Sequence, residues 1–179
     1  MNWSEWNLWQ WPFLDTKHHA LAERAKAWNA QAHTLPDEEL SVHCRHIAKS
    51  LGDPGLLEAV VPADGEPFDV RSLCTMREAL TFHDALSDAI FAMQGIGTLA
   101  IQQFGTEAQK ERYLDPCRRG DKVAAFAVTE PEVGSDVASM RTSATLVGDH
   151  YVLNGSKTLI SNAQFADHFL VVARTGEAE

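Results

Sequence analysis

The pattern of apolar residues changes once along the chain, near Gly120, and this change limits the folds that the sequence can adopt. Before Gly120, apolar residues recur at the three- and four-residue spacing of amphipathic helices. After it, short apolar runs are separated by turns that contain glycine, which is typical of strands. The sequence therefore predicts an α+β protein in which an all-α part precedes a β part, and not an alternating series of strands and helices.

Capping residues divide the helical part into its elements. Asp15, Asp37 and Asp69 are the expected N-caps of the first three helices. Residues 82–104 predict one or two helices that are apolar on nearly every side, which is typical of interior helices. Thr106-Glu-Ala-Gln109 is a capping box for a last helix, which ends before Gly120.

Turn residues divide the β part in the same way. Gly148-Asp149 predicts a tight hairpin, and Asn154-Gly155 predicts a type I′ turn into a further strand. Such a sheet has an open edge, which natural sheets avoid, so we expect the β part to be incomplete. The predicted strands are residues 123–129, 143–147, 151–154, 157–160 and 169–173.

Charge and composition exclude several classes of protein. The net charge is −10, and no basic run is longer than Arg118-Arg119, which argues against a nucleic-acid-binding protein. No apolar stretch approaches the ~20 residues of a membrane span, and the N-terminus does not resemble a secretory signal. Three widely spaced cysteines, Cys44, Cys74 and Cys117, favour reduced thiols and a cytoplasmic location.

Four of the five tryptophans lie in the first thirteen residues. We expect this segment to be an arm packed on its own domain or on a neighbouring subunit. A membrane-surface anchor is the less favoured alternative, because the segment has no Lys or Arg to meet anionic lipid.

The segment from Phe126 to Val137 carries the chemistry. A strand ends at Thr129, Pro131 prevents its continuation, and a small turn follows at Gly134-Ser-Asp136. Exposed N–H groups in such a turn can bind an anion, and glycine lets a phosphate approach closely. The alternative is an ordinary loop with a cap at Asp136. A Rossmann dinucleotide site is excluded, because the segment is not G-x-G-x-x-G between a strand and a helix.

Two segments taken together resemble a known signature. Phe126-Ala-Val-Thr-Glu-Pro-x-x-Gly-Ser-Asp136 and Tyr151-Val-Leu-Asn-Gly-Ser-Lys-Thr-Leu-Ile-Ser-Asn162 are similar to the flavin-binding signature of the acyl-CoA dehydrogenase family. Residues 105–114 resemble the helix that precedes it in that family. The resemblance implies an α-helical N-terminal domain, a middle β-barrel domain and a C-terminal four-helix bundle. The bundle is absent from these 179 residues.

This resemblance also implies a division of the chain. Residues 1–14 would form the Trp-rich N-terminal arm, residues 15–121 the α-helical N-terminal domain, and residues 122–179 a partial flavin-binding middle β-domain.

The resemblance further implies the roles of individual residues. Ser161 would place its hydroxyl near flavin N5, and Ser135 would also contact the pantetheine arm of an acyl-CoA. Leu159 stands where the family commonly has an aromatic residue, which opens the flavin to solvent or to a partner. Ala92 and Ile96 would border the acyl-chain pocket. The residues expected to bind FAD are Phe126, Val128, Thr129, Gly134, Ser135, Leu159, Ile160 and Ser161.

The implied activity is α,β-dehydrogenation of an acyl-CoA thioester in fatty acid metabolism, with hydride transfer to flavin N5. The catalytic base is expected beyond Glu179, so residues 1–179 alone are expected to be inactive. An electron-transfer flavoprotein would accept the electrons, and the whole protein would be a homodimer or homotetramer. Two alternatives stay open: an oxygen-reactive relative (an acyl-CoA oxidase or a flavin monooxygenase), and an inactive helical interaction module.

Two other candidate sites are less favoured. Glu130 follows the flavin-lining segment and is an alternative base, although a role in bracing the loop is preferred. His43 and His46 are three residues apart on a predicted helix, but a pair without a third ligand does not predict a metal site.

Overall fold

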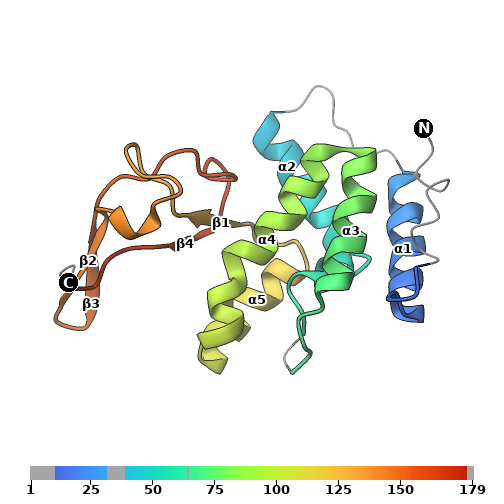
Figure 1. Ribbon diagram of the computed structural model, residues 1–179, viewed down its shortest axis with the longest axis horizontal. Helices are drawn as coiled ribbons and strands as arrows, with labels where there is room; N and C mark the ends of the chain where they lie inside the picture. Colours follow the sequence, from blue (N-terminus) through green and yellow to red (C-terminus); the bar gives the residue numbers. More distant parts are fainter. Residues whose placement is uncertain (1–10, 32–38, 64, 177–179) are drawn as a thin grey trace.

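The computed structural model of the chain describes residues 11–31, 39–63 and 65–176. A group of packed helices is followed by a β part that extends away from them, on the side opposite α1 (Figure 1). This confirms the predicted α+β architecture. The helices are α1 (Thr16–Asn29), α2 (Leu40–Gly52), the 3₁₀ helix η3 (Leu56–Ala59), α3 (Val70–His83), α4 (Ala85–Phe104) and α5 (Glu107–Arg118).

The predicted caps begin the helices where the structure describes them. Asp15 and Thr106 take part in capping boxes, and the Asp69 side chain accepts a hydrogen bond from the N–H of Arg71. Asp37 lies outside the described residues. No helix in the described ranges is both long enough and apolar enough to cross a membrane.

The helices pack around one apolar core. α4 contacts α2, α3 and α5 as well as the β part, so it is the central element. Burial of aliphatic and aromatic side chains from every helix is the main source of stability of this part of the chain. Fully buried members of the core include Ala25, Ile47, Leu51, Leu57, Met76, Leu80 and Phe91.

Two expectations for residues 82–104 need correction. The structure has one helix here, within the predicted count, but it begins only after Asp84, whose side chain caps it, and Phe82 belongs to the last turn of α3, which ends at His83. The helix is also not interior on every side, because Ile96 and Leu99 are each 38% exposed and Phe104 is 83% exposed. Its apolar pattern does not reveal which face the neighbouring helices leave open.

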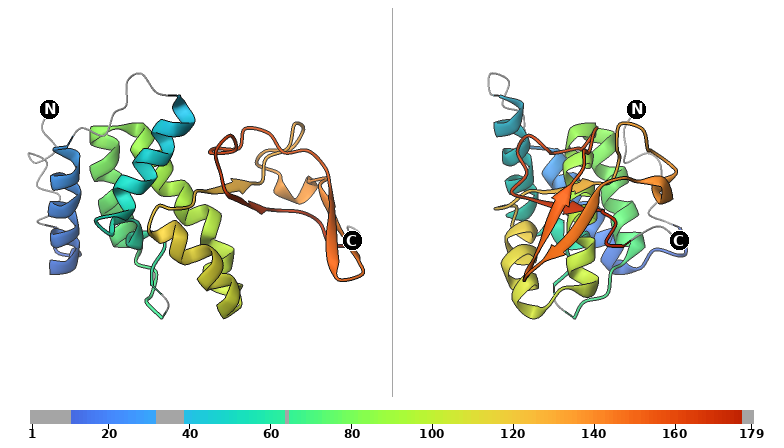
Figure 2. Two further views of the ribbon diagram at one scale, coloured as in Figure 1. Left: turned by 180° about the vertical axis from the view of Figure 1, so that it is seen from behind. Right: turned by 90° about the vertical axis from the view of Figure 1, so that its left-hand side faces the viewer.

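The β part consists of two small sheets. β1 (Ala124–Ala127) pairs in parallel with β4 (His168–Val171), and the antiparallel hairpin of β2 (Ser143–Val147) and β3 (His150–Asn154) lies at the far end from the helices (Figure 2). The hairpin turn at Gly148 is as predicted, with φ of 66°.

A predicted strand at residues 157–160 is absent, and this prediction was wrong. Gly155 has φ of 157°, which does not fit a type I′ turn, and Leu159 and Asn162 adopt positive φ values of 56° and 66°. The chain therefore bends twice in this region, where the apolar pattern indicated extended backbone.

The start of the Trp-rich arm lies outside the described residues. Its last residues contact the helical part, where the carbonyl of Phe13 accepts a hydrogen bond of 2.6 Å from Arg71 in α3. The aromatic rings of Trp11 and Phe13 meet edge to face.

Candidate functional site

The loop after β1 makes a tight turn at its start. The N–H of Glu130 donates to the carbonyl of Val133 at 2.9 Å, and the N–H of Val133 donates back at 3.2 Å. Pro131 lies inside this turn, but β1 ends earlier, at Ala127, and not at Thr129 as predicted. The turn directs the following residues, Gly134 to Asp136, to the surface.

Gly134 is not required by the fold of the described chain. A Cβ atom added to it would have no heavy atom within 4 Å, and its φ is not positive. In the described part of the chain, no group accepts a hydrogen bond from the N–H of Gly134, Ser135 or Asp136. Open space beside unpaired N–H donors is the arrangement that an anionic group such as a phosphate requires.

The second signature segment lies beside the first, although it is not a strand. The N–H of Thr158 donates to the carbonyl of Thr129 at 2.9 Å. The Lys157 ammonium donates to the carbonyl of Val128 at 2.8 Å. Residues that are about thirty positions apart in the sequence are therefore joined by direct hydrogen bonds.

The side chains expected to bind a cofactor have free hydrogen-bonding capacity. Among the described residues, the hydroxyls of Thr129, Ser135 and Ser161 form no side-chain hydrogen bond. Thr129 is half-buried, whereas Ser135 and Ser161 are exposed. The Leu159 side chain is 88% exposed, so the bend at this residue presents it to solvent.

The remaining predicted cofactor side chains are less exposed than that of Leu159. Phe126, Val128 and Ile160 are half-buried, and Phe126 lies within β1, opposite Leu170 of β4.

Glu130 is held by three donors beneath the signature loop. Its carboxylate accepts hydrogen bonds from the N–H of Arg141 at 2.7 Å and of Thr142 at 2.9 Å, and from the Lys157 ammonium at 2.9 Å. Hydrogen bonds from Thr142, Arg141 and Lys157 lower the pKa of Glu130 to about 2. A carboxylate that is fixed and ionised in this way is a poor general base. The geometry supports the bracing role and argues against Glu130 as the catalytic base.

Ala92 and Ile96 lie together at an apolar pocket between α3 and α4. The pocket has a volume of about 100 Å³. Ala92 is 7% exposed, so its methyl group faces this pocket and not open solvent. Arg77 lines the pocket and forms a bidentate ion pair with Asp88 of α4, at 2.8 and 2.7 Å. The other lining residues are Val60, Phe68, Leu73, Gly95 and Leu99.

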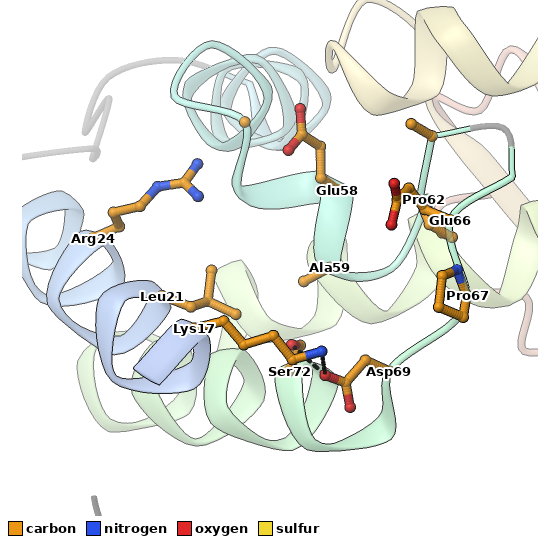
Figure 3. A pocket seen from close by; sticks show the side chains of 12 residues that line it. Lys17, Leu21, Arg24, Glu58, Ala59, Pro62, Glu66, Pro67, Asp69 and Ser72 are labelled. Carbon is orange, nitrogen blue, oxygen red and sulfur yellow. Dashed lines mark hydrogen bonds and ion pairs between the residues drawn. The ribbon is translucent and has the colours of Figure 1, made fainter. Parts of the chain in front are cut away.

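A second pocket, of about 470 Å³, lies between α1, η3, α3 and the loop before α3 (Figure 3). The Lys17 ammonium and the Asp69 carboxylate form an ion pair of 2.5 Å at its edge. None of the predicted site residues lines it.

The described residues contain no group of three or more His, Cys, Asp or Glu side chains that could hold a metal ion. His43 and His46 both lie on α2, without a third ligand in the part of the chain that the structure describes.

Comparison with known proteins identifies the family. The acyl-CoA dehydrogenase N-terminal domain matches residues 15–121, and the acyl-CoA dehydrogenase middle domain matches residues 125–179. The chain belongs to the acyl-CoA dehydrogenase family. Its fold, a helical N-terminal domain followed by part of a middle β-domain, is that of the family.

Relatives and solved structures agree with this assignment. A probable acyl-CoA dehydrogenase of Bacillus subtilis (strain 168) is 41% identical over 136 residues, which are 74% of this chain and 23% of that protein. The human mitochondrial very long-chain specific acyl-CoA dehydrogenase is 50% identical over 101 residues, which are 55% of this chain and 15% of that protein.

Among solved structures, the Bacillus anthracis acyl-CoA dehydrogenase complexed with FAD superimposes with a TM-score of 0.78 at 32% identity, covering 91% of this chain and 29% of the other. A glutaryl-CoA dehydrogenase from Mycobacterium smegmatis gives a TM-score of 0.77 at 28% identity, covering 91% and 44%. The chain therefore spans less than half the length of these proteins.

Sequence reasoning missed Lys157 as a site residue, although it is part of the second signature segment. The available signal was that Lys157 is the only charged residue between Tyr151 and Ala166. The Lys157 side chain is 11% exposed, which is unusual for lysine and indicates a specific role.

Proposed function

We propose that the complete protein is an FAD-dependent acyl-CoA dehydrogenase, which removes two hydrogens from the Cα–Cβ bond of an acyl-CoA thioester. The observation that carries the proposal is the pairing of the two signature segments through Thr158 and Thr129, at 2.9 Å. Because Leu159 follows Thr158 directly, this bond supports a site shared by Thr129 and the Leu159–Ser161 segment. Family membership and the relatives named as acyl-CoA dehydrogenases support the same activity.

The residues present fit a flavin dinucleotide. The unpaired N–H groups around Ser135 suit the pyrophosphate, and the free hydroxyls of Thr129 and Ser161 suit the polar edge of the ring. FAD, when bound, supplies the hydride acceptor. We assign its binding to Phe126, Val128, Thr129, Gly134, Ser135, Leu159, Ile160 and Ser161.

The chain's own residues bind and orient the reactants. Ala92 and Ile96 border the apolar pocket that we assign to the acyl chain, where burial of methylene groups favours binding. Ser135 is assigned to the pantetheine arm as well. Because Glu130 is fixed by three donors, we propose that a carboxylate outside residues 1–179 removes the α-proton.

We further propose that the electrons pass to an electron-transfer flavoprotein, and that the complete protein is a cytoplasmic homodimer or homotetramer. The exposed Leu159 is a candidate contact for the electron acceptor, because it lies beside the residues assigned to the flavin.

Anaerobic titration of the purified complete protein with acyl-CoA thioesters of increasing chain length tests the proposal. The expected result is one bound flavin per chain and loss of its visible absorbance on addition of substrate. Mixing the reduced protein with oxygen then distinguishes a dehydrogenase, which reoxidises slowly, from an oxidase or monooxygenase, which reoxidises quickly. A protein without flavin that is inert to every thioester would support the interaction-module alternative.

A further inference from the structure

We propose that Glu130 and Lys157 are positioning residues for hydride transfer: their ion pair sets the distance and orientation between the two segments that line the flavin. The proposal rests on the proposed function, because it assumes that these segments bind FAD. It assigns the pair a role in the reaction, beyond the general bracing of a loop.

Glu130 ties its loop to the start of the β hairpin. It is 4% exposed, and its two carboxylate oxygens accept hydrogen bonds from the successive N–H groups of Arg141 and Thr142. Since β2 begins at Ser143, the carboxylate fixes the end of β1 against the beginning of the hairpin. Thr129 directly precedes Glu130, so the hydrogen bonds of the Glu130 carboxylate also restrict the position of Thr129.

Lys157 extends this connection to the second segment. Its ammonium bridges one oxygen of Glu130, at 2.9 Å, and the carbonyl of Val128, at 2.8 Å. The next residue, Thr158, is hydrogen-bonded to Thr129 at 2.9 Å. Lys157 is therefore bonded on both sides of Thr129, and Ser161 follows only four residues later.

Stability alone is a weak explanation for such a pair. Replacing a buried ion pair by apolar side chains of similar size is often neutral or stabilising, because both charges must be removed from water. A pair that connects three chain segments instead specifies their relative geometry. Hydride transfer is sensitive to that geometry, since a misplacement of about 1 Å can reduce a rate by about 100-fold.

The variants Lys157→Met and Glu130→Gln test this role in the complete flavin-bound protein. Lys157→Met is the milder change, because Glu130 keeps its two backbone donors. Lys122→Met is the matched control: it removes an ion pair with Asp167, at 3.3 Å, that lies outside the signature segments and in which the Lys122 side chain is 54% exposed. Each protein is measured for flavin affinity, for the rate of flavin reduction at saturating acyl-CoA, for KM and for melting temperature.

We expect Lys157→Met and Glu130→Gln to lower the rate of flavin reduction, or the flavin affinity, by about tenfold or more, with KM for acyl-CoA changed by less than about twofold. The double variant should lose no more than the worse single variant, because the two residues act as one unit. The control should stay within about twofold of wild type in every measurement.

The result that overturns the inference is a lowered melting temperature with unchanged reduction rate and flavin affinity, measured where the variants are folded. Additive losses in the double variant would also overturn it, because the residues would then act separately. A wild-type protein without flavin would overturn the proposed function itself, and this is established before any variant is compared.

Discussion

The side chain of Gln94 in α4 accepts a hydrogen bond of 2.8 Å from the N–H of Ala124, the first residue of β1. The same side-chain amide donates to the carbonyls of Cys117, at 3.0 Å, and Lys122, at 2.8 Å. Gln94 is completely buried. One side chain thus fixes the end of α5, the turn that follows and the start of β1 against α4, the helix that carries Ala92 and Ile96.

Replacement of Gln94 by methionine, which has a similar shape, should be strongly destabilising. The variant leaves the N–H of Ala124 and the carbonyl of Lys122 without a partner, whereas the carbonyl of Cys117 still accepts a hydrogen bond from the N–H of Gly120. We expect it to lose about 2–4 kcal/mol of stability. Gln103→Met, on an exposed position of the same helix, is the control and should change stability by less than about 0.5 kcal/mol. Thermal unfolding of both variants beside wild type measures the difference; equal melting temperatures would show that the amide contributes little.

The close approach of α4 to β1 depends on Gly97. A Cβ atom added there would lie 2.7 Å from the Cβ of Ala124 and 3.1 Å from the N of Ala125, too close for van der Waals contact. Gly97→Ala should therefore separate the helix from the strand and destabilise the protein by about 1–3 kcal/mol. Gly176→Ala, where the added methyl group meets nothing within 4 Å, should be neutral. Melting temperatures test this pair, and a neutral Gly97→Ala would mean that the interface adapts.

The sequence predicts the helical part well because its signals are local. Asp15, Asp69 and Thr106 begin their helices, since a cap bonds to N–H groups only two or three residues away. The region after Asn154 could not be predicted in this way. There, the backbone of residue 158 bonds to Thr129, and this distant contact favours a bend over the strand that the local apolar pattern indicated.

The candidate site shows the same contrast between signals that are local in the sequence and contacts between distant residues. The residues assigned to the flavin came from the resemblance, and their chemical roles remain predictions. The ion pair of Glu130 and Lys157 could not be foreseen, because a sequence does not state which of its charges meet across 27 residues. Gln94 was missed for the same reason: nothing marks it within an apolar helix except that it is polar.

Glu130 makes stability depend on pH in acid. Hydrogen bonds from Thr142, Arg141 and Lys157 lower its pKa from 4.5 to about 2, so the folded protein binds this proton less readily than the unfolded chain. Its contribution is therefore complete above pH 4.5 and is lost as the pH falls toward about 2. We expect the difference in melting temperature between wild type and Glu130→Gln to shrink across that range. A constant difference would show that ionisation of Glu130 does not contribute.

The three cysteines should differ sharply in reactivity. Cys74 is exposed, whereas Cys44 and Cys117 are buried, and burial raises the pKa of both, that of Cys117 to about 12. Because the thiolate is the reactive form, iodoacetamide should label Cys74 first in the native protein. Mass spectrometry of the labelled protein identifies the site, and Cys74→Ser should abolish the fast phase. Rapid labelling of Cys117 would indicate that the junction of α5 and β1 opens readily.

A larger side chain at Ala92 can test whether this residue lines an acyl-chain site or belongs to an ordinary packed core. At a pocket wall, Ala92→Phe should shorten the longest acyl chain that the complete protein accepts and leave short substrates nearly unaffected. In a packed core, the same change should strain the fold by about 1–3 kcal/mol and lower activity on all substrates alike. Ala92 faces a pocket of about 100 Å³, which favours the first outcome.

The measurement is kcat/KM for a series of chain lengths, with melting temperatures, for wild type, Ala92→Phe and the control Ala85→Phe at an exposed position of α4. We expect a selective loss on long chains in Ala92→Phe and no change in Ala85→Phe. The selectivity matters more than the size of the loss, because a ring placed in the pocket blocks only the carbons that would have occupied it. A uniform loss together with a lower melting temperature would remove Ala92 from the pocket and assign it to the core between α3 and α4.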